Sequence, residues 1–220
     1  MADRTAGEEE STEAEALREA LMAAFWVDLS PEEVPEGVAF GELFERIREK
    51  AGPSLRPACL TSVAFYRLRP ELARLAGCGR RSIHPDTPLS TLFPSWRRRR
   101  AQWSGLDAAT RLRLPGLVPP DGSGKATAAC AFLMAGAAGS ALFVPVFALG
   151  MFLAALTIGW LSRGIPGRLV TVGDLARSAA GLNHGKLSRE AGGTTLKQMW
   201  RAFQEAAGEA EGVDPLLIEQ

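Results

Sequence analysis

The stretch Ala126–Leu161, ATAACAFLMAGAAGSALFVPVFALGMFLAALTIGWL, has thirty-six residues without a charged side chain and lies between Lys125 and Arg163. One α-helix of this length would extend about 54 Å, well beyond a hydrocarbon core of about 30 Å. Two helices of about seventeen residues each fit that thickness, because Gly139 and Pro145 permit a reversal near the middle. The stretch therefore predicts a two-helix transmembrane hairpin over residues 126–161.

The alternative interpretation of this stretch is a buried helical hairpin in a soluble protein. We prefer the membrane interpretation, because so long an uncharged run is rare outside lipid. A hairpin places both flanks on one side of the bilayer, and both flanks carry arginines close to it, such as Arg113 and Arg163. The positive-inside rule then predicts a bacterial inner-membrane protein with both termini in the cytoplasm and the lipid bilayer as a partner.

The rest of the chain predicts helices and no strand, since no segment alternates apolar and polar residues. The fold class we expect is all-α, with the hairpin between small cytoplasmic helical-bundle segments. The C-terminal segment is too short to fold alone with ease, so we expect it to dock on another part. The expected parts are a disordered acidic tail (1–10), a helical region (11–113, divisible into 11–52 and 57–113), a linker (114–125), the hairpin (126–161) and a C-terminal helical segment (168–220).

Capping residues and apolar spacing locate the individual helices. Thr12 with Glu15 predicts the start of a helix over residues 13–26, and Phe40 begins a second amphipathic helix that ends at Gly52. A third helix is expected from residue 57 to about 76, with a kink at its proline. Past the hairpin, Thr171 with Asp174 and Thr195 with Gln198 predict two further helix starts, and the polar stretch between these helices contains Asn183, His184 and Gly185.

A helix that follows Ser95 has two interpretations that the sequence supports equally. It can lie on an anionic membrane surface, with aromatic side chains at the headgroup level and arginines above them. It can also be a solvated basic face that packs on its own domain through its two tryptophans. The predicted membrane-surface residues are Trp96, Arg97, Arg98, Arg99, Arg100 and Trp103.

Residues 27–34, 79–89 and 212–218 share one layout, in which an amphipathic helix ends and a loop with acid or proline leads to a branched aliphatic residue. This layout resembles the first helix and loop of acyl carrier proteins, which are small helical bundles. In that family an Asp-Ser-Leu at the next helix carries phosphopantetheine. Here Phe93-Pro94-Ser95-Trp96 stands at the corresponding place, so the resemblance implies that Ser95 would hold the cofactor, whereas an N-cap is the simpler role.

No cluster of acid, base and nucleophile marks a catalytic site, and no paired cysteines mark a metal site. His84 and His184 are expected to be ordinary loop residues, and Cys59 and Cys78 have no local motif that would lower a thiol pKa. The net charge of zero predicts no nucleic-acid partner, although residues 1–15 are acidic and residues 96–113 basic.

We therefore expect a membrane-tethered, non-enzymatic helical interaction or scaffold protein, which binds a protein partner or itself. The alternative is a membrane-anchored acyl or peptidyl carrier with phosphopantetheine on Ser95. Neither interpretation predicts a resident metal or any other cofactor.

Overall fold

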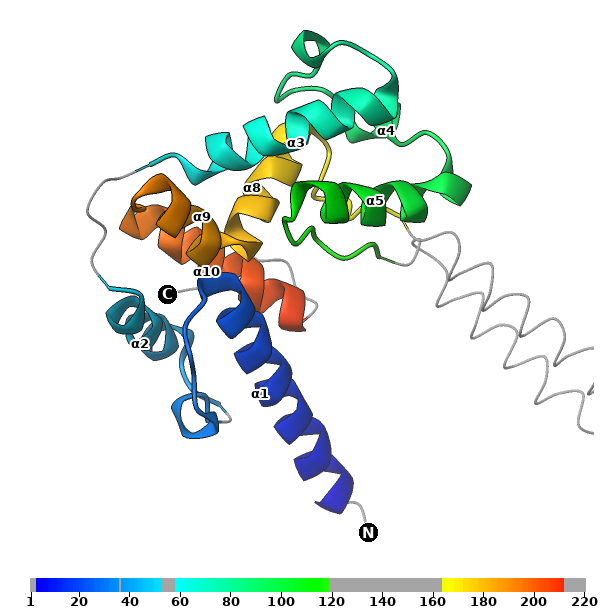
Figure 1. Cartoon of the computed structure of the whole chain (residues 1–220). Coiled ribbons are helices and arrows are strands. Elements are labelled where there is room, and N and C mark those ends of the chain that lie inside the picture. The colour runs from blue at the N-terminus through cyan, green and yellow to red at the C-terminus, as the bar shows by residue number, and fades with distance from the viewer. Residues whose placement is uncertain (1–2, 36, 53–57, 119–163, 212–220) are drawn as a thin grey trace, which may run out of the picture.

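The computed structural model describes residues 3–35, 37–52, 58–118 and 164–211, and every regular element in these ranges is helical (Figure 1). The predicted all-α class is therefore confirmed for the described part of the chain. Its elements are α1 (Asp3–Phe25), η1 (Pro31–Glu33), α2 (Phe40–Ala51), α3 (Leu60–Ala76), η2 (Arg80–Ser82), α4 (Leu89–Leu92), α5 (Trp96–Thr110), α8 (Val172–Leu182), α9 (His184–Ala191) and α10 (Leu196–Glu211).

The transmembrane part of the predicted fold needs correction. Residues 126–161 lie outside the described ranges, and none of the helices within those ranges is long and apolar enough to cross a bilayer. The long helices α1 and α3 carry charged residues along their length, which a membrane span does not tolerate. The fold class is corrected to all-α, and the bacterial inner-membrane location that depended on the hairpin is withdrawn with it.

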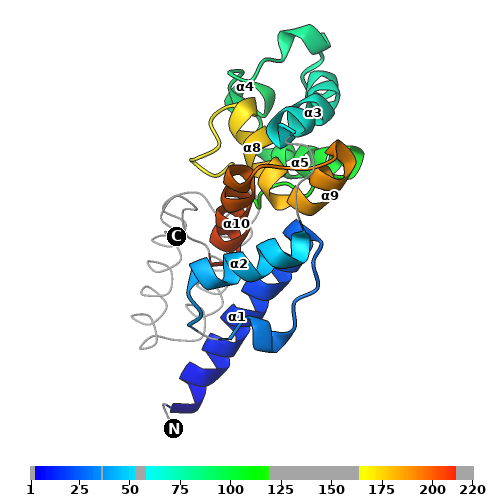
Figure 2. The ribbon, with the colours of Figure 1, turned by 90° about the vertical axis from the view of Figure 1, so that its left-hand side faces the viewer.

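Two hydrophobic cores hold the described helices together. One core joins α1, α2 and α10 around fully buried side chains such as Phe44 and Phe203. The other joins α3, α4, α5, α8 and α9 around Leu68, Phe93 and Leu175. Figures 1 and 2 show α1 and α2 at one end of the molecule and α3 and α4 at the other, with α5, α8, α9 and α10 nearer the middle. The C-terminal segment therefore docks on both earlier parts of the chain.

Local capping explains where several helices begin. Thr171 Oγ1 accepts a hydrogen bond from the Asp174 backbone N–H at 3.2 Å, and Asp174 Oδ2 accepts one from the Thr171 N–H at 3.0 Å, which confirms the predicted capping box of α8. Thr195 Oγ1 accepts from the Gln198 N–H at 3.3 Å at the start of α10. However, α1 begins at Asp3 rather than near residue 13, and residues 3–10 were expected to be disordered. Their glutamates are good helix formers.

Backbone pairing joins the two described residues that border residues 119–163 in the sequence. The Val118 N–H donates to the Gly164 carbonyl at 3.0 Å, and the Gly164 N–H donates back to Val118 at 2.7 Å. A second isolated bridge joins Pro88 to Thr171. The two bridges fix the beginning of the C-terminal segment beside α4 and α5, so that α8 enters the core at a defined position.

Gly185 lies where the end of α1 meets α9, so a substitution at this position tests the contact between these helices. A Cβ at this position would lie 2.1 Å from the Phe25 carbonyl oxygen, because the end of α1 packs directly on the backbone of α9. We predict that Gly185→Ala lowers the free energy of unfolding by at least about 3 kcal/mol through this clash. The measurement is urea denaturation of the full chain.

The matched control is Gly105→Ala in α5, where a Cβ would meet no heavy atom within 4 Å. This variant should gain up to about 1 kcal/mol, because alanine is the better helix former. Equal stability of the two alanine variants would contradict the contact between α1 and α9.

Candidate functional site

The residues predicted from sequence do not gather into one site. Ser95 is the half-buried N-cap of α5, and its hydroxyl makes no capping hydrogen bond. Trp103 is only 6% exposed, its ring lies 5.5 Å from that of Phe93, and its indole N–H donates to the Pro115 carbonyl at 3.0 Å. Trp103 is therefore a core residue and not a membrane-surface anchor, which corrects that assignment.

The arginines of α5 have different surroundings. Arg98 and Arg100 are exposed, whereas Arg99 is half-buried and donates to the Phe93 carbonyl at 3.1 Å. The side chains of Trp96 and Arg97 lie outside the described part. The placement of Trp103 and Arg99 agrees with the second interpretation of this helix, a basic face packed on its own domain.

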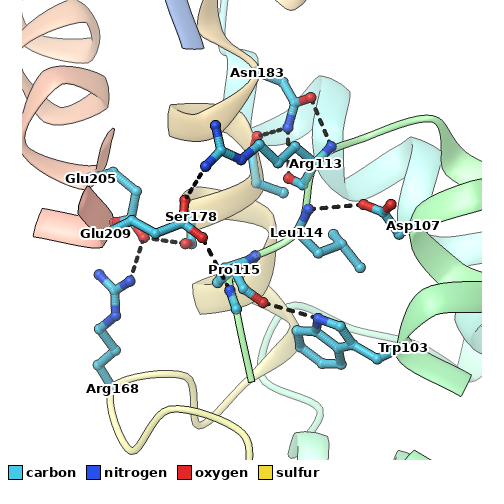
Figure 3. A network of polar contacts seen from close by, with 12 residues as sticks. Trp103, Asp107, Arg113, Leu114, Pro115, Arg168, Ser178, Asn183, Glu205 and Glu209 are labelled. Carbon is cyan, nitrogen blue, oxygen red and sulfur yellow. Dashed lines mark hydrogen bonds and ion pairs between the residues drawn. The ribbon is translucent and has the colours of Figure 1, made fainter. Parts of the chain in front are cut away.

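Buried polar residues instead converge at the junction of α8 and α9. Asn183 holds the backbone of Arg113 from both sides, since its Oδ1 accepts from the Arg113 N–H at 2.9 Å and its Nδ2 donates to the Arg113 carbonyl at 2.8 Å (Figure 3). The same Nδ2 also donates to the Ala179 carbonyl at 2.7 Å. The Asn183 amide thus pairs with the backbone as a neighbouring β-strand would, and it fixes residues 111–116 against α8.

Carboxylates complete the network in Figure 3. Glu209 accepts from the Gly116 N–H at 3.2 Å and pairs with Arg113 at 3.3 Å. Glu205 accepts from the Ser178 hydroxyl and pairs with Arg168 at 2.9 Å. Because these groups bond to one another, the network stabilises the fold.

His184, the first residue of α9, is an ionisable group that the fold buries almost completely. It is 3% exposed, and its ring centroid lies 5.0 Å from that of Phe25. Burial lowers the pKa of this imidazole from 6.5 to about 4, so the ring is neutral at pH 7. The expectation of an ordinary loop histidine was wrong, because tertiary packing that no local pattern encodes buries the residue.

Hydrogen bonding orients the His184 ring. Its Nε2 lies 3.2 Å from Thr194 Oγ1, and this hydroxyl donates to Gln198 Oε1 at 3.0 Å. The glycine-rich loop before α10 therefore orients the imidazole.

A cavity of about 460 Å³ opens beside this ring, between the end of α2, α9 and the start of α10. The apolar side chains in its lining are Phe25, Leu196 and Met199, and its hydroxyl groups come from Ser188, Thr194 and Thr195. Three cations, Arg48, Lys50 and Arg189, line it as well, and none of the described lining residues is Asp or Glu.

Each of these cations is held by a neighbour. Lys50 Nζ lies 2.6 Å from Glu33 Oε2, and Arg48 pairs with Glu45 at 2.5 Å. Arg189 donates to the Trp26 carbonyl at 3.0 Å, and its guanidinium lies 5.2 Å from the centroid of the Trp26 ring. These contacts restrict the side chains around the cavity, so that less conformational entropy is lost when a ligand binds.

His184 also lines a second cavity of about 460 Å³, which includes Cys59. The Ser62 hydroxyl donates to Cys59 Sγ at 3.2 Å, and this hydrogen bond lowers the pKa of the thiol below its usual value. A serine three residues after a helix-capping cysteine was the sequence signal for this shift, and our expectation of no such motif was wrong. The described residues contain no cluster of His, Cys, Asp or Glu that could hold a metal.

The low pKa of His184 predicts that the stability of the fold depends on pH. Below about pH 6.5 the unfolded imidazole binds a proton, whereas the folded one does so only near pH 4. Stability therefore falls as the pH drops through this window, by about 3 kcal/mol from this residue between pH 7 and pH 4. Urea denaturation across this pH range should show that His184→Gln removes this part of the loss.

The matched variant His84→Gln changes the exposed loop histidine and should keep the full pH-dependent loss. If His184→Gln and the unmodified chain lose stability in parallel, the burial of the His184 ring is contradicted.

No family model, curated protein or solved structure matches this chain. Any functional conclusion therefore depends on the residues of this chain alone. Among the described residues, the cavity beside His184 combines an apolar wall, fixed hydrogen-bonding groups and cations, which makes it the candidate functional site.

Proposed function

We propose that this chain is a non-enzymatic helical binding protein, and that the cavity beside His184 binds a small amphipathic anion. The observation that carries the proposal is the composition of the cavity lining, in which three cations and several apolar side chains occur without a carboxylate. Such a lining favours a ligand with an apolar body and one anionic group.

The size of the cavity supports a ligand of low molecular weight. Sites for small molecules commonly enclose about 300–1,000 Å³ and are mostly apolar with a few polar groups, and this cavity holds about 460 Å³. Phe25 and Met199 are buried core residues, so the apolar wall against which a ligand would pack is rigid. A neutral His184 adds a polar group without a charge.

The electrostatics of the lining favour an anion. Arg48, Lys50 and Arg189 contribute positive charge, and the backbone at Thr194, Thr195 and Leu196 belongs to the positive end of the α10 dipole. Both contributions attract negative charge to the same cavity. Their surface partners reduce the attraction of the cations, so we expect moderate rather than extreme affinity.

Binding accounts for the cavity better than catalysis does. A general base needs a proton acceptor whose pKa lies near the working pH, and His184 has a pKa of about 4. No carboxylate in the described lining could raise that value or assist proton transfer. The carrier role of Ser95 stays a prediction, since no described contact of that residue favours phosphopantetheine attachment.

The test uses 8-anilinonaphthalene-1-sulfonate, an amphipathic anion whose fluorescence rises in apolar surroundings. We predict saturable binding to one site on the full chain, displacement by octanoate, and displacement by uncharged 1-octanol at least about tenfold weaker. The double variant Arg48→Gln/Arg189→Gln should lower affinity for the sulfonate about tenfold, because it removes two cations from the cavity.

The control is Arg74→Gln/Arg98→Gln, which removes two exposed arginines that do not line the cavity. This control should bind the sulfonate with unchanged affinity. Non-saturable fluorescence, or an equal loss of affinity in both double variants, would contradict a specific anion site beside His184.

A further inference from the structure

The two ends of the molecule have opposite charge. Residues 3–52 contain fourteen acidic and five basic residues, whereas residues 58–118 contain eleven basic and three acidic ones. Every basic residue in the second range is an arginine. Figures 1 and 2 both place α1 and α2 at one end of the molecule and α3 and α4 at the other, with α5 nearer the middle, so the net charge of zero conceals an acidic end and a basic end.

The basic end carries a groove of about 300 Å³ between α3, the loop after η2 and α8. Tyr66 lines this groove and is 66% exposed, which is unusual for so large an aromatic ring. Its ring centroid lies 5.4 Å from that of Phe65, and the Arg69 guanidinium lies 5.7 Å from the Phe65 centroid. None of the described residues that line the groove is acidic.

Two arginines of η2, Arg80 and Arg81, come directly before the loop that lines the groove. Arg69 Nε donates to the Arg80 carbonyl at 2.7 Å, which fixes η2 against α3. The side chains of Arg80 and Arg81 are exposed, and neither guanidinium has a hydrogen-bond or ion-pair partner among the described residues. The basic end thus presents an exposed aromatic ring in the groove and two exposed arginines in the segment next to it.

We infer that this groove binds single-stranded nucleic acid, with one base stacked on Tyr66 and the phosphates paired with Arg80 and Arg81. A base stacks on an aromatic side chain whatever its identity, because every base has a π-face. Guanidinium groups match phosphate oxygens in a bidentate arrangement, which suits a surface that uses arginine alone. The earlier expectation of no nucleic-acid partner gave the total charge more weight than the uneven distribution of charge along the sequence.

An acidic protein segment is the competing partner, and the ring of Tyr66 distinguishes the two. Carboxylates would pair with Arg80 and Arg81 and need no flat ring beside them. A nucleic acid uses the ring and the charges together. The open groove beside an exposed tyrosine therefore favours the nucleic acid.

The experiment is fluorescence polarisation of the full chain with a fluorescein-labelled oligothymidylate of about twenty nucleotides. We expect binding that weakens steeply between about 50 mM and about 200 mM salt. Tyr66→Ala should weaken binding at least about fivefold, while Tyr66→Phe keeps it. Arg80→Gln/Arg81→Gln should weaken binding and lower the salt slope by about one to two.

The matched control is Arg46→Gln in α2 at the acidic end, which should leave binding unchanged. The inference is overturned by absence of binding at the lowest salt, by unchanged affinity of folded Tyr66→Ala, or by equal affinity for a poly-glutamate of similar length. The sulfonate assay reports on the cavity beside His184, so it can succeed or fail independently.

Discussion

The structure depends on one constraint, the burial of three consecutive residues where α8 meets α9. Asn183 holds the backbone of Arg113, which fixes the strip after α5 to α8. His184 packs on the Phe25 ring, and Gly185 admits the Phe25 carbonyl where any larger residue would clash. One tripeptide thus contacts both hydrophobic cores, so that the earlier parts of the chain are joined through a segment that comes later in sequence.

This junction also explains the cavity. A buried neutral imidazole is tolerated there because its Nε2 forms a hydrogen bond with the Thr194 hydroxyl, which in turn contacts Gln198 Oε1. The same contacts hold the glycine-rich loop that lines the cavity. The residues that join the two cores are therefore the residues that shape the candidate site, and a ligand there would stabilise the junction itself.

Features encoded within a few residues could be predicted from sequence. The capping box at Thr171 and Asp174 and most described helices were found, because capping and amphipathic spacing are local. Features that need tertiary contacts were missed, since nothing near His184 indicates that Phe25 covers it. The start of α1 was missed because the composition of the tail did not indicate a helix. The sequence could not choose between the two interpretations of α5, because the bond from Trp103 to Pro115 is a tertiary contact. The hairpin was predicted from hydropathy, length and flanking charge, and no described helix supports it.

The net charge of the chain does not show where its charged residues lie in the fold. The described C-terminal residues are nearly balanced, with six basic and five acidic side chains, and their helices lie between the two charged ends. From there Glu190 pairs with Arg67 at 2.6 Å and Glu209 with Arg113 at 3.3 Å, so the middle segment neutralises arginines that face it. Arginines on the outer edge, such as Arg80 and Arg81, receive no such partner among the described residues. The fold therefore decides which positive charges stabilise the molecule and which stay available for recognition.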